Sequence, residues 1–326
     1  MSESEAEAQG EEIPEGIYGW GMEIADSYLA SLAWRIMFRL DRLVGMRAAR
    51  VVVAGLLRMI SWSPSGYVRT TYRLVERRDV APDIARIPSL WWTRAPTVSV
   101  KRLGLRFVLD LRDNLQRVLF FAGVYEPAVL GRILSELSQG AVYVDGGAHV
   151  GVHALPVSKA LGTLGGGRVY AVEPNEEASN RLREAAHANG LAVEIVPFAL
   201  SDLQRTLTLR SDERYADADL GVLSAYGTGD KIVQVKATTF DDWAEAVRLE
   251  RLDIVKLDVE GSEGAALAGM SRTLRRLRPG LVIVETKEAS LRRAGGTADE
   301  IHSFLRDHGY THEATVPFSN AIFVLT

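Results

Sequence analysis

From residue 141 to the end of the chain, short apolar runs alternate with stretches of helical period. The apolar runs predict strands at 141–145, 168–173, 192–197, 253–258 and 281–286. The amphipathic stretches predict helices near 151–162, 176–189, 262–277 and 297–308. Because strands and helices that alternate in this way build a mostly parallel sheet covered on both faces, we expect a doubly wound α/β domain over residues 141–326.

Two segments of this domain depart from the alternation. The insertion 203–239 contains the strings TLTL and IVQVKA, which predict an antiparallel strand pair joined by a polar loop at 211–230. The final string, YTHEATVPFSNAIFVLT, predicts two more strands with a turn at 317–320. We therefore expect a C-terminal antiparallel strand pair beside the parallel strands.

Residues 97–140 form a predicted cap ahead of the α/β domain. The segments 97–100 and 106–111 alternate in polarity around Gly104, which indicates a β-hairpin. A helix is expected to begin near Glu126, because the proline that follows it is favoured in the first turn of a helix.

The first 96 residues divide into two predicted parts. Residues 1–16 are polar and acidic, which is typical of a disordered lead, and residues 17–96 form a helical extension and connector. From 25 to 62 the extension has helical period, with apolar residues on one side and arginines on the other. Such a helix packs on the body of the protein or on a second subunit, or lies on an anionic membrane. The pattern leaves homodimerisation and peripheral membrane contact open.

Composition narrows the class of protein. With 38 basic and 42 acidic residues the formal net charge is −4, so no nucleic-acid partner is expected. The absence of cysteine excludes disulfides and thiolate chemistry and fits a reducing cytosol. No run of about 18 uncharged apolar residues occurs, so we expect no spanning helix. The predicted location is the cytoplasm, with the inner face of the membrane as the peripheral alternative.

The string VDGGAHVG, residues 144–151, follows the first predicted strand and opens the first predicted helix. Its glycines permit a backbone close to a nucleotide-like ligand, and the helix N-terminus offers free N–H groups. A dinucleotide-binding turn requires the motif G-x-G-x-x-G. This string matches that motif only imperfectly, because alanine stands at the position of the second glycine. An acid before the glycines favours S-adenosylmethionine, because it receives an ammonium group and repels a pyrophosphate. The predicted cofactor contacts in this turn are Asp145, Gly146, Gly147, Ala148, His149 and Gly151.

The next two strands supply further predicted cofactor contacts. The second strand ends in Glu173, followed by Pro174, at the place where a carboxylate holds the ribose hydroxyls of either cofactor. A carboxylate that only stabilises the next helix is the alternative interpretation. After the third strand, the string VPFALSD offers apolar and polar residues for an adenine ring, although a surface turn would also explain its polar end. The adenine candidates are Phe198, Ala199, Ser201 and Asp202.

The fourth strand carries the main candidates for chemistry. The string DIVKLDVEGSE places Lys256, Asp258 and Glu260 at or beyond its carboxyl end, where open parallel sheets bind ligands. The fifth strand adds Glu285. Ionisable groups in such a crevice are costly unless they are paired or used, and a Lys256–Asp258 pair without a catalytic role is the alternative. The acids have oxygen ligands that Mg²⁺ accepts, but their spacing is not diagnostic and no metal site is predicted.

The series VDGGAHVG, AVEP, ALSD, TTFDDW and DIVKLDVEGSE, with YEP ahead of it and IVET after it, resembles the FkbM-type S-adenosylmethionine-dependent methyltransferases. The resemblance covers roughly residues 105–290. It implies a class I methyltransferase fold and O-methylation of a hydroxyl on a sugar, in a glycan or glycolipid, or on a natural product. Members commonly carry asparagine where this chain has His149.

Methyl transfer to a hydroxyl is an in-line displacement that also requires a place for the hydroxyl proton. We expect Asp258 or Glu260 to act as the base or to orient the hydroxyl, with Lys256 and Glu285 shaping the pocket and His153 as a secondary base; Asp258 is also a candidate contact of the cofactor. The alternatives are an NAD(P)-dependent oxidoreductase and a non-catalytic, membrane-associated binding module on the same fold.

Overall fold

The structure is a computed structural model, and it describes residues 97–110, 113–211 and 223–326. Residues 81–120 and 124–326 group into one compact unit, and the elements described below belong to it, apart from the last residues of one helix. The predictions for residues 1–16 and 17–96, including the 25–62 helix, lie outside the described residues, as does most of the predicted 211–230 loop.

A central seven-stranded sheet organises this unit, in the order β12-β13-β11-β10-β3-β4-β5. Its strands are β3 (Val142–Gly146), β4 (Arg168–Val172), β5 (Glu194–Val196), β10 (Ile254–Leu257), β11 (Leu281–Glu285), β12 (Tyr310–Val316) and β13 (Asn320–Leu325). The first five are parallel to one another, whereas β13 runs antiparallel to both β11 and β12. The predicted mostly parallel sheet and its C-terminal antiparallel pair are therefore confirmed.

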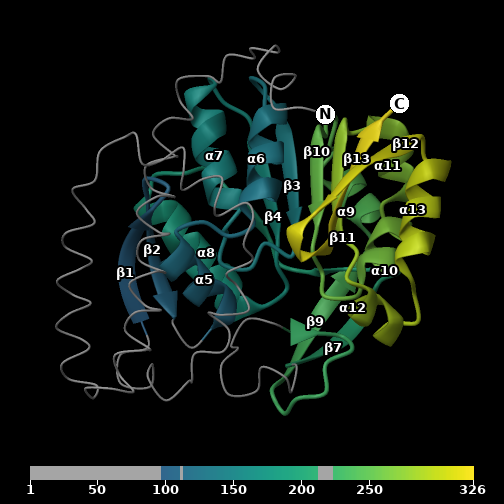
Figure 1. Ribbon diagram of the computed structural model, residues 1–326, viewed down its shortest axis with the longest axis horizontal. Helices are drawn as coiled ribbons and strands as arrows, with labels where there is room; N and C mark the ends of the chain where they lie inside the picture. The colour runs from purple at the N-terminus through teal and green to yellow at the C-terminus, as the bar shows by residue number, and fades with distance from the viewer. Residues whose placement is uncertain (1–96, 111–112, 212–222) are drawn as a thin grey trace, which may run out of the picture. The chain divides into compact units, whose positions relative to one another are not determined.

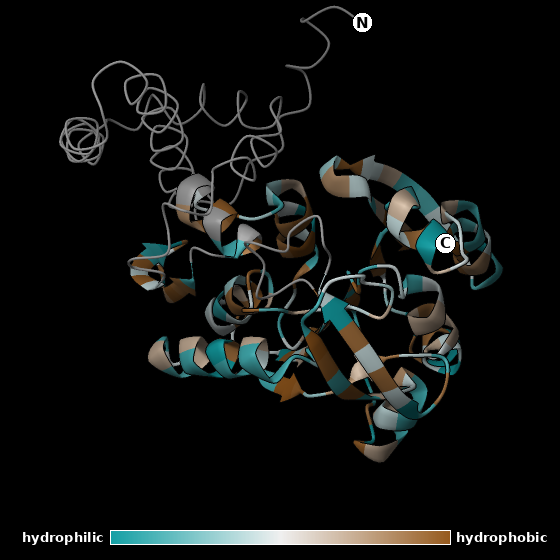
Figure 2. Ribbon diagram, turned by 90° about the horizontal axis from the view of Figure 1, so that it is seen from below, coloured by the Kyte–Doolittle hydropathy of each residue, from teal (hydrophilic) through white to brown (hydrophobic). Residues whose placement is uncertain are grey.

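Helices cover both faces of this sheet. They are α6 (Pro127–Glu136), α7 (Ala154–Thr163), α8 (Glu176–Ala188), α9 (Phe240–Ala246), α10 (Glu263–Ala268), α11 (Ser271–Leu277), α12 (Glu288–Arg293) and α13 (Ala298–Asp307). Figure 1 shows α6, α7 and α8 on one side of the strands and α9, α11 and α13 on the other. Helices in Figure 2 carry both teal and brown segments, as expected where one face of an amphipathic helix is buried. The predicted doubly wound α/β architecture is thus present.

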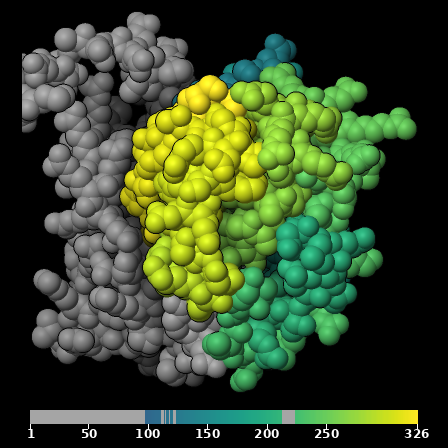
Figure 3. Space-filling view, turned by 90° about the vertical axis from the view of Figure 1, so that its right-hand side faces the viewer, coloured from purple at the N-terminus to yellow at the C-terminus, as the bar shows by residue number. Residues whose placement is uncertain are grey.

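The strands are apolar on both faces because helices cover both faces. In β10, Ile254, Val255 and Leu257 are fully buried, and β11 is buried along its whole length. One continuous core joins these strands to α9, α11 and α13. On the face in Figure 3, the yellow C-terminal residues lie directly against green residues from the middle of the chain. This packing fixes the carboxyl ends of the strands, where the site lies.

The structure corrects two predicted helix boundaries. The predicted helix 262–277 is two helices, α10 and α11, because the backbone of Gly269 packs against a neighbouring loop: a Cβ there would lie 2.0 Å from the carbonyl oxygen of Ser201. Helix α7 begins at Ala154 rather than at 151, because Gly151 has a φ of 86°, which no right-handed helix contains.

The helix α9 was not predicted, although its N-cap is visible in the sequence. The side chain of Thr239 accepts a hydrogen bond from the backbone N–H of Asp242, and two aspartates occupy the first turn. The short helix α12 was also not predicted.

The cap and the insertion have the predicted hairpins. The cap contains β1 (Thr97–Arg102) paired antiparallel with β2 (Leu105–Asp110), then α5 (Asn114–Ala122) and α6. The strand β2 lies against α8, where the Asn189 side chain bonds to the backbone of Arg106. The insertion pairs β7 (Arg205–Ser211) with β9 (Ile232–Thr238) in a second sheet that includes β6 (Ala199–Leu200) and β8 (Leu223–Ser224).

Within the described ranges, no helix is long and apolar enough to cross a membrane.

Candidate active site

The glycine turn after β3 lies directly against the end of β10. A Cβ on Gly147 would stand 1.8 Å from the carbonyl oxygen of Asp258, and the residue has a φ of 82°. The backbone N–H groups of Gly147 and Ala148 donate to the carbonyl of Val172, at 2.9 and 3.1 Å. Only glycine combines this positive φ with this close approach. The turn therefore brings the ends of β3, β4 and β10 together.

Asp145, the acid before the glycines, is buried, and its oxygens have no partner at ordinary hydrogen-bond geometry. Its exposed fraction is 1%, and the nearby Tyr143 hydroxyl and Ala154 backbone N–H only moderate the effect of burial on its pKa. Burial raises the pKa of Asp145 to about 6, although the positive charge of Lys256 opposes the shift. A buried carboxylate of this kind is costly, and a bound cation that donates hydrogen bonds to its oxygens, such as an ammonium group, would offset that cost.

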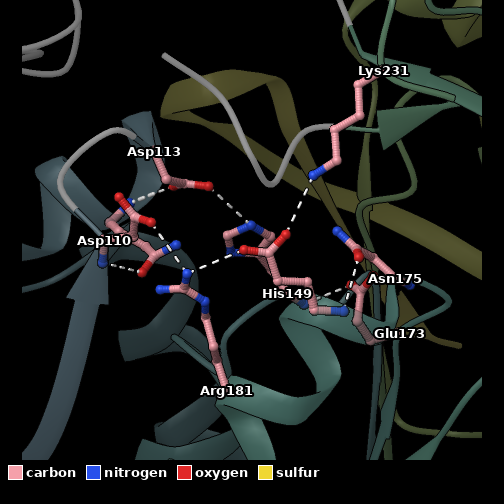
Figure 4. Close-up of polar contacts among 9 residues, drawn as sticks. Asp110, Asp113, His149, Glu173, Asn175, Arg181 and Lys231 are labelled. Carbon is pink, nitrogen blue, oxygen red and sulfur yellow. Dashed lines mark hydrogen bonds and ion pairs between the residues drawn. The ribbon is translucent and has the colours of Figure 1, made fainter. Parts of the chain in front are cut away.

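Glu173, at the end of β4, holds the other side of the turn. Its Oε2 accepts a hydrogen bond of 2.8 Å from the backbone N–H of His149, and its Oε1 accepts one of 2.8 Å from Asn175 (Figure 4). Burial raises the pKa of Glu173, and the charge of His149 opposes that effect. Each carboxylate oxygen retains a second lone pair, which is what ribose hydroxyl groups need.

His149 adopts the left-handed conformation, with φ of 50°. Asparagine adopts this conformation more readily than most residues, which fits the asparagine that members of the resembling family carry here. The ring Nε2 of His149 lies 3.3 Å from Oδ2 of Asp113, at the start of the cap helix α5. Burial raises the pKa of Asp113, but His149 and hydrogen bonds from Gln116 outweigh it and leave the pKa below its usual value.

Figure 4 shows that this contact belongs to a larger polar network between the cap and α8. The guanidinium of Arg181 lies 3.1 Å from both Asp110 and Glu177, and Lys231 of the insertion reaches Glu177 at 3.4 Å. The sequence did not indicate Asp113, because the acid that meets His149 comes from a different part of the fold. The network ties the predicted cap to the predicted cofactor turn.

Lys256 is the buried centre of the second half of the site. It stands beside Asp145 in the strand register of β10 and β3, and its Nζ donates to Oδ2 of Asp258 at 2.9 Å. The exposed fraction of Lys256 is 1%. Burial alone would lower the pKa of Lys256, but the negative charges of Asp258, Glu126 and Asp145 outweigh burial and leave the pKa above its usual value, so the ammonium group stays charged. The predicted Lys256–Asp258 pair is present. Asp258 retains an 18% exposed side chain, which leaves it open to a substrate.

Glu126, which was not predicted, lies on the other side of Lys256. It is 3% exposed and occupies the N-cap of α6 with φ of 45°. Its Oε1 accepts a hydrogen bond of 2.7 Å from Asn320 of β13, and its Oε2 lies 3.7 Å from Nζ of Lys256 and 3.5 Å from Nε2 of His153. Burial raises the pKa of Glu126 to about 7, against the lowering effect of Lys256. The YEP string was the only sequence signal for this residue.

His153, predicted as a secondary base, lies deep beside Glu126. It is buried, and its ring meets Tyr125 edge-on at 6.1 Å between centroids. Burial, helped by the charge of Lys256, lowers the pKa of His153 well below its usual value, so the ring is neutral at physiological pH. The lowered pKa makes the His153 ring a weak base, and its burial keeps it from solvent, which favours Asp258 over His153 as the group that meets the substrate.

A second group of acids follows β10 and β11. Burial raises the pKa of Glu285 to about 10, and the charges of Asp258 and Glu260 add to the shift. Glu260 has φ of 53°, and its carbonyl accepts a hydrogen bond of 2.7 Å from Ser224 of the insertion. Glu285 is therefore neutral at physiological pH and can donate a hydrogen bond. No three His, Asp or Glu side chains in the described part of the chain are arranged to hold a metal ion.

The adenine candidates divide between two places. Phe198 and Ala199 are buried at the end of β5, and the Phe198 ring lies 6.4 Å from that of Trp243. Ser201 bonds to Asp202 at 3.0 Å, and Arg205 reaches both. The contact of these four residues with an adenine ring stays a prediction.

Left-handed backbone at residues other than glycine gathers at this edge of the sheet. Among the described residues eight such positions occur, and five surround the site: Glu126, His149, Glu260, Phe318 and Ser319. Phe318 stacks on Tyr125 at 6.0 Å, and the carbonyl of Ser319 accepts from the backbone and side chain of Thr286 at the end of β11. Strain of this kind persists where the surrounding structure enforces it, as at functional sites.

Comparison with known proteins identifies the class. The family model of the methyltransferase FkbM domain matches residues 145–311, which begins at the acid of the glycine turn. The chain belongs to the FkbM methyltransferase family, and it is a methyltransferase.

One curated relative and several solved structures are similar to the chain. The hexuronic acid methyltransferase AglP of Haloferax volcanii is 26% identical over 193 residues, which is 59% of this chain and 74% of the relative. A SAM-dependent methyltransferase from Aquifex aeolicus is 16% identical, with coverage of 62% of this chain and 91% of that one and a TM-score of 0.36. The fibrillarin of Aeropyrum pernix, crystallised with S-adenosyl-L-methionine, is also 16% identical, with coverage of 60% and 72% and a TM-score of 0.36.

Proposed function

We propose that the protein is an S-adenosylmethionine-dependent O-methyltransferase whose acceptor is a hydroxyl group of a sugar. The observation that carries the proposal is Asp145: a buried carboxylate whose oxygens have no partner at ordinary hydrogen-bond geometry, beside a turn that only glycine can form. The family supports methyl transfer, and the relative named for hexuronic acid supports a sugar as the acceptor.

The residues at the ends of β3 and β4 fit the cofactor. Asp145 would receive its ammonium group, and Glu173 would receive the ribose hydroxyls through its remaining lone pairs. The close approach of Gly147 to the backbone of Asp258 holds the turn against the end of β10, beside both acids. An aspartate in this place would repel the pyrophosphate of a dinucleotide, so the structure favours the sulfonium cofactor over the NAD(P) alternative.

Asp258 is the residue best placed to act on the acceptor. Its side chain is partly exposed, while Lys256 holds one of its oxygens at 2.9 Å. When bound, the cofactor supplies an electrophilic methyl group. Asp258 would orient the acceptor hydroxyl toward that group and take its proton as the oxygen–carbon bond forms. Lys256 limits the motion of the carboxylate, and the ionised pair is shielded in a largely buried setting.

Glu260 and Glu285 would complete the acceptor site. Glu285 is neutral at physiological pH and would donate a hydrogen bond to an acceptor oxygen, whereas Glu260 offers a second carboxylate. A hydrogen-bond donor and a hydrogen-bond acceptor in one site suit a sugar, because each sugar hydroxyl group can both donate and accept. Dimerisation or membrane contact through the 25–62 helix stays a prediction.

Transfer of a radiolabelled methyl group tests this function. We expect label from S-adenosylmethionine to enter a hexuronic acid glycoside or a neutral hexose glycoside, and Asp258→Asn to lower the turnover number by about 10²–10⁴, the range typical of a lost general base. The affinity for S-adenosylhomocysteine should change by less than about threefold, since no cofactor-anchoring charge is lost. The matched control is Asp307→Asn on the exposed end of α13.

Two results would count against the assignment. Full turnover in both Asp258→Asn and Glu260→Gln would remove these acids from the mechanism. Binding of NAD⁺ in preference to S-adenosylhomocysteine would remove the cofactor.

A further inference from the structure

Two aromatic rings are stacked at the carboxyl edge of the sheet, close to the acids of the site. The rings of Tyr125 and Phe318 lie 6.0 Å apart between centroids and are inclined by 25°, and His153 meets the Tyr125 ring edge-on. Tyr125 and Phe318 are both half-buried, so part of their aromatic surface is accessible. An accessible apolar surface therefore lies beside the charged groups of the site.

The backbone that carries Phe318 is tied to the end of β11. Phe318 belongs to the turn Pro317–Ser319 between β12 and β13. The carbonyl oxygen of Ser319 accepts hydrogen bonds of 2.7 Å from the backbone N–H and 2.8 Å from the hydroxyl of Thr286, the first residue after β11. Because neighbouring strands lie about 4.8 Å apart, the ends of β13 and β10, with β11 between them, are separated by roughly 10 Å. Phe318 and Asp258 are thus within reach of one ligand.

Tyr125 is fixed at the same edge by the residue that follows it. Glu126 accepts a hydrogen bond of 2.7 Å from the first residue of β13 and lies 3.7 Å from Lys256 of β10. Burial raises the pKa of Tyr125, and the negative charges of Glu126 and Asp258 add to the shift, so the hydroxyl group stays protonated. Tyr125 therefore supports the Phe318 ring from a position next to the acids.

The backbone conformation of Phe318 is costly for a residue of this kind. Its φ is 67° and that of Ser319 is 62°, both in the left-handed region. A bulky side chain rarely adopts this region, whereas glycine or asparagine adopts it at lower cost. The hydrogen bonds from Thr286 hold the turn in place. Reversal of the chain alone does not require a phenylalanine at this position.

The strand order places Phe318 on the side of Asp258 that faces away from the proposed cofactor contacts. Strand β10, which precedes Asp258, lies between β11 and β13 on one side and β3 and β4 on the other. Asp145 and Glu173 lie at the ends of β3 and β4. A ligand on Phe318 would therefore approach Asp258 from the side opposite the cofactor, as an in-line displacement requires of the acceptor.

We propose that Phe318, backed by Tyr125, is the stacking surface on which the sugar ring of the methyl acceptor binds. The face of an aromatic ring is negative, and it attracts the weakly positive C–H groups on the apolar face of a pyranose. The ring would rest on Phe318 while one of its hydroxyl groups meets Asp258. The inference rests on the proposed function, because it requires a sugar as the acceptor.

The acceptor KM of Phe318 variants tests this surface. The probes are methyl β-D-glucopyranoside and methyl β-D-glucopyranosiduronic acid, and the one that takes up more label from S-adenosylmethionine is used. Phe318→Leu keeps apolar bulk but loses the aromatic face, so we expect the acceptor KM to rise by about 3–10-fold. The turnover number and the KM for S-adenosylmethionine should change by less than about twofold. Phe318→Tyr, which keeps the aromatic face, should retain the KM of the wild type.

The matched control is Phe304→Leu. Phe304 is also half-buried and stacked, on His308 at 4.1 Å, but it lies on the outer helix α13. This control should leave the acceptor KM unchanged. An unchanged KM in Phe318→Leu, an equal rise in Phe304→Leu, or an equal rise in Phe318→Tyr would overturn the inference and leave the proposed function intact. Labelling of neither probe by the wild type would overturn both.

If Phe318→Leu does not fold, saturation-transfer NMR on the wild type decides. In both probes the protons H1, H3 and H5 lie on one face of the sugar ring, and H2 and H4 lie on the other. When the aromatic protons of the protein are irradiated, a sugar stacked on Phe318 should receive saturation mainly on one of these two faces. Equal saturation of both faces would contradict the proposal.

Discussion

Replacing Asp145 by asparagine should stabilise the ligand-free protein while it weakens cofactor binding. Burial raises the pKa of Asp145 from 3.8 to about 6, so the ionised carboxylate costs folding free energy at every pH above that range. A shift of roughly two units corresponds to about 3 kcal/mol at most. Because a buried asparagine amide also lacks partners, we expect a net gain of about 1–2 kcal/mol at pH 7.5, or a few degrees in Tm.

The sign of the effect depends on pH. The acid is neutral in both the folded and unfolded states only well below its unfolded-state pKa of 3.8, so wild type and variant should differ least there. As the pH rises from about 4 to about 6, the wild type loses the stability that the variant keeps. Thermal unfolding of both proteins across this range would show the difference grow and then level off above pH 7.

The same substitution should lower the affinity for S-adenosylhomocysteine by about 10²–10⁴, since loss of one partner of a buried ion pair costs about 3–5 kcal/mol. Calorimetry at pH 7.5 measures this loss of affinity in the same Asp145→Asn variant whose Tm is expected to rise. A variant that is less stable at pH 7.5 and binds the ligand as tightly as the wild type would refute the reasoning, because Asp145 would then be a structural residue.

Other residues at the turn carry separate predictions. Gly147→Ala should destabilise the fold by more than about 3 kcal/mol, seen as a lower Tm, because its Cβ would overlap the carbonyl of Asp258. Gly131→Ala in α6, where nothing lies within 4 Å, should instead stabilise by about 0.5–1 kcal/mol; a loss equal to that of Gly147→Ala would contradict the close-approach argument. Glu173→Gln should weaken S-adenosylhomocysteine binding by about 10–100-fold through loss of a charged acceptor worth about 1.5–3 kcal/mol, with exposed Glu176→Gln as the control; unchanged binding would remove the ribose role.

The sheet could be predicted from the sequence because burial on both faces leaves a direct mark on the strands. Runs such as IVKL and LVIVE have no polar alternation, and each run is bounded by breakers or charged residues. The glycine turn was also predictable, since the positive φ of Gly147 and Gly151 belongs to the local strand–helix junction. The atoms that these glycines approach most closely, in Asp258 and Leu182, are distant in the sequence and could not be predicted.

Glu126 and Asp113 could not be predicted, because their roles come from long-range contacts. Glu126 meets Asn320, 194 residues away, and Lys256 on a third element. Asp113 meets His149 only because the cap folds back onto the glycine turn. A glutamate before a proline reads as an ordinary helix start, and nothing local marks it as buried.

The break between α10 and α11 has the same kind of cause. The segment 262–277 has helical composition throughout, and Gly269 alone is a weak signal. The helix ends there because the backbone of Ser201 occupies the space beside it.

A crystal structure of the complex with S-adenosylhomocysteine is the most direct test of the role of Asp145. We expect the ligand's ammonium nitrogen within hydrogen-bonding distance of the Asp145 carboxylate, with the ribose hydroxyls on Glu173 and the sulfur facing Asp258. A ligand bound at this edge of the sheet with its ammonium away from Asp145, or bound elsewhere on the protein, would contradict it.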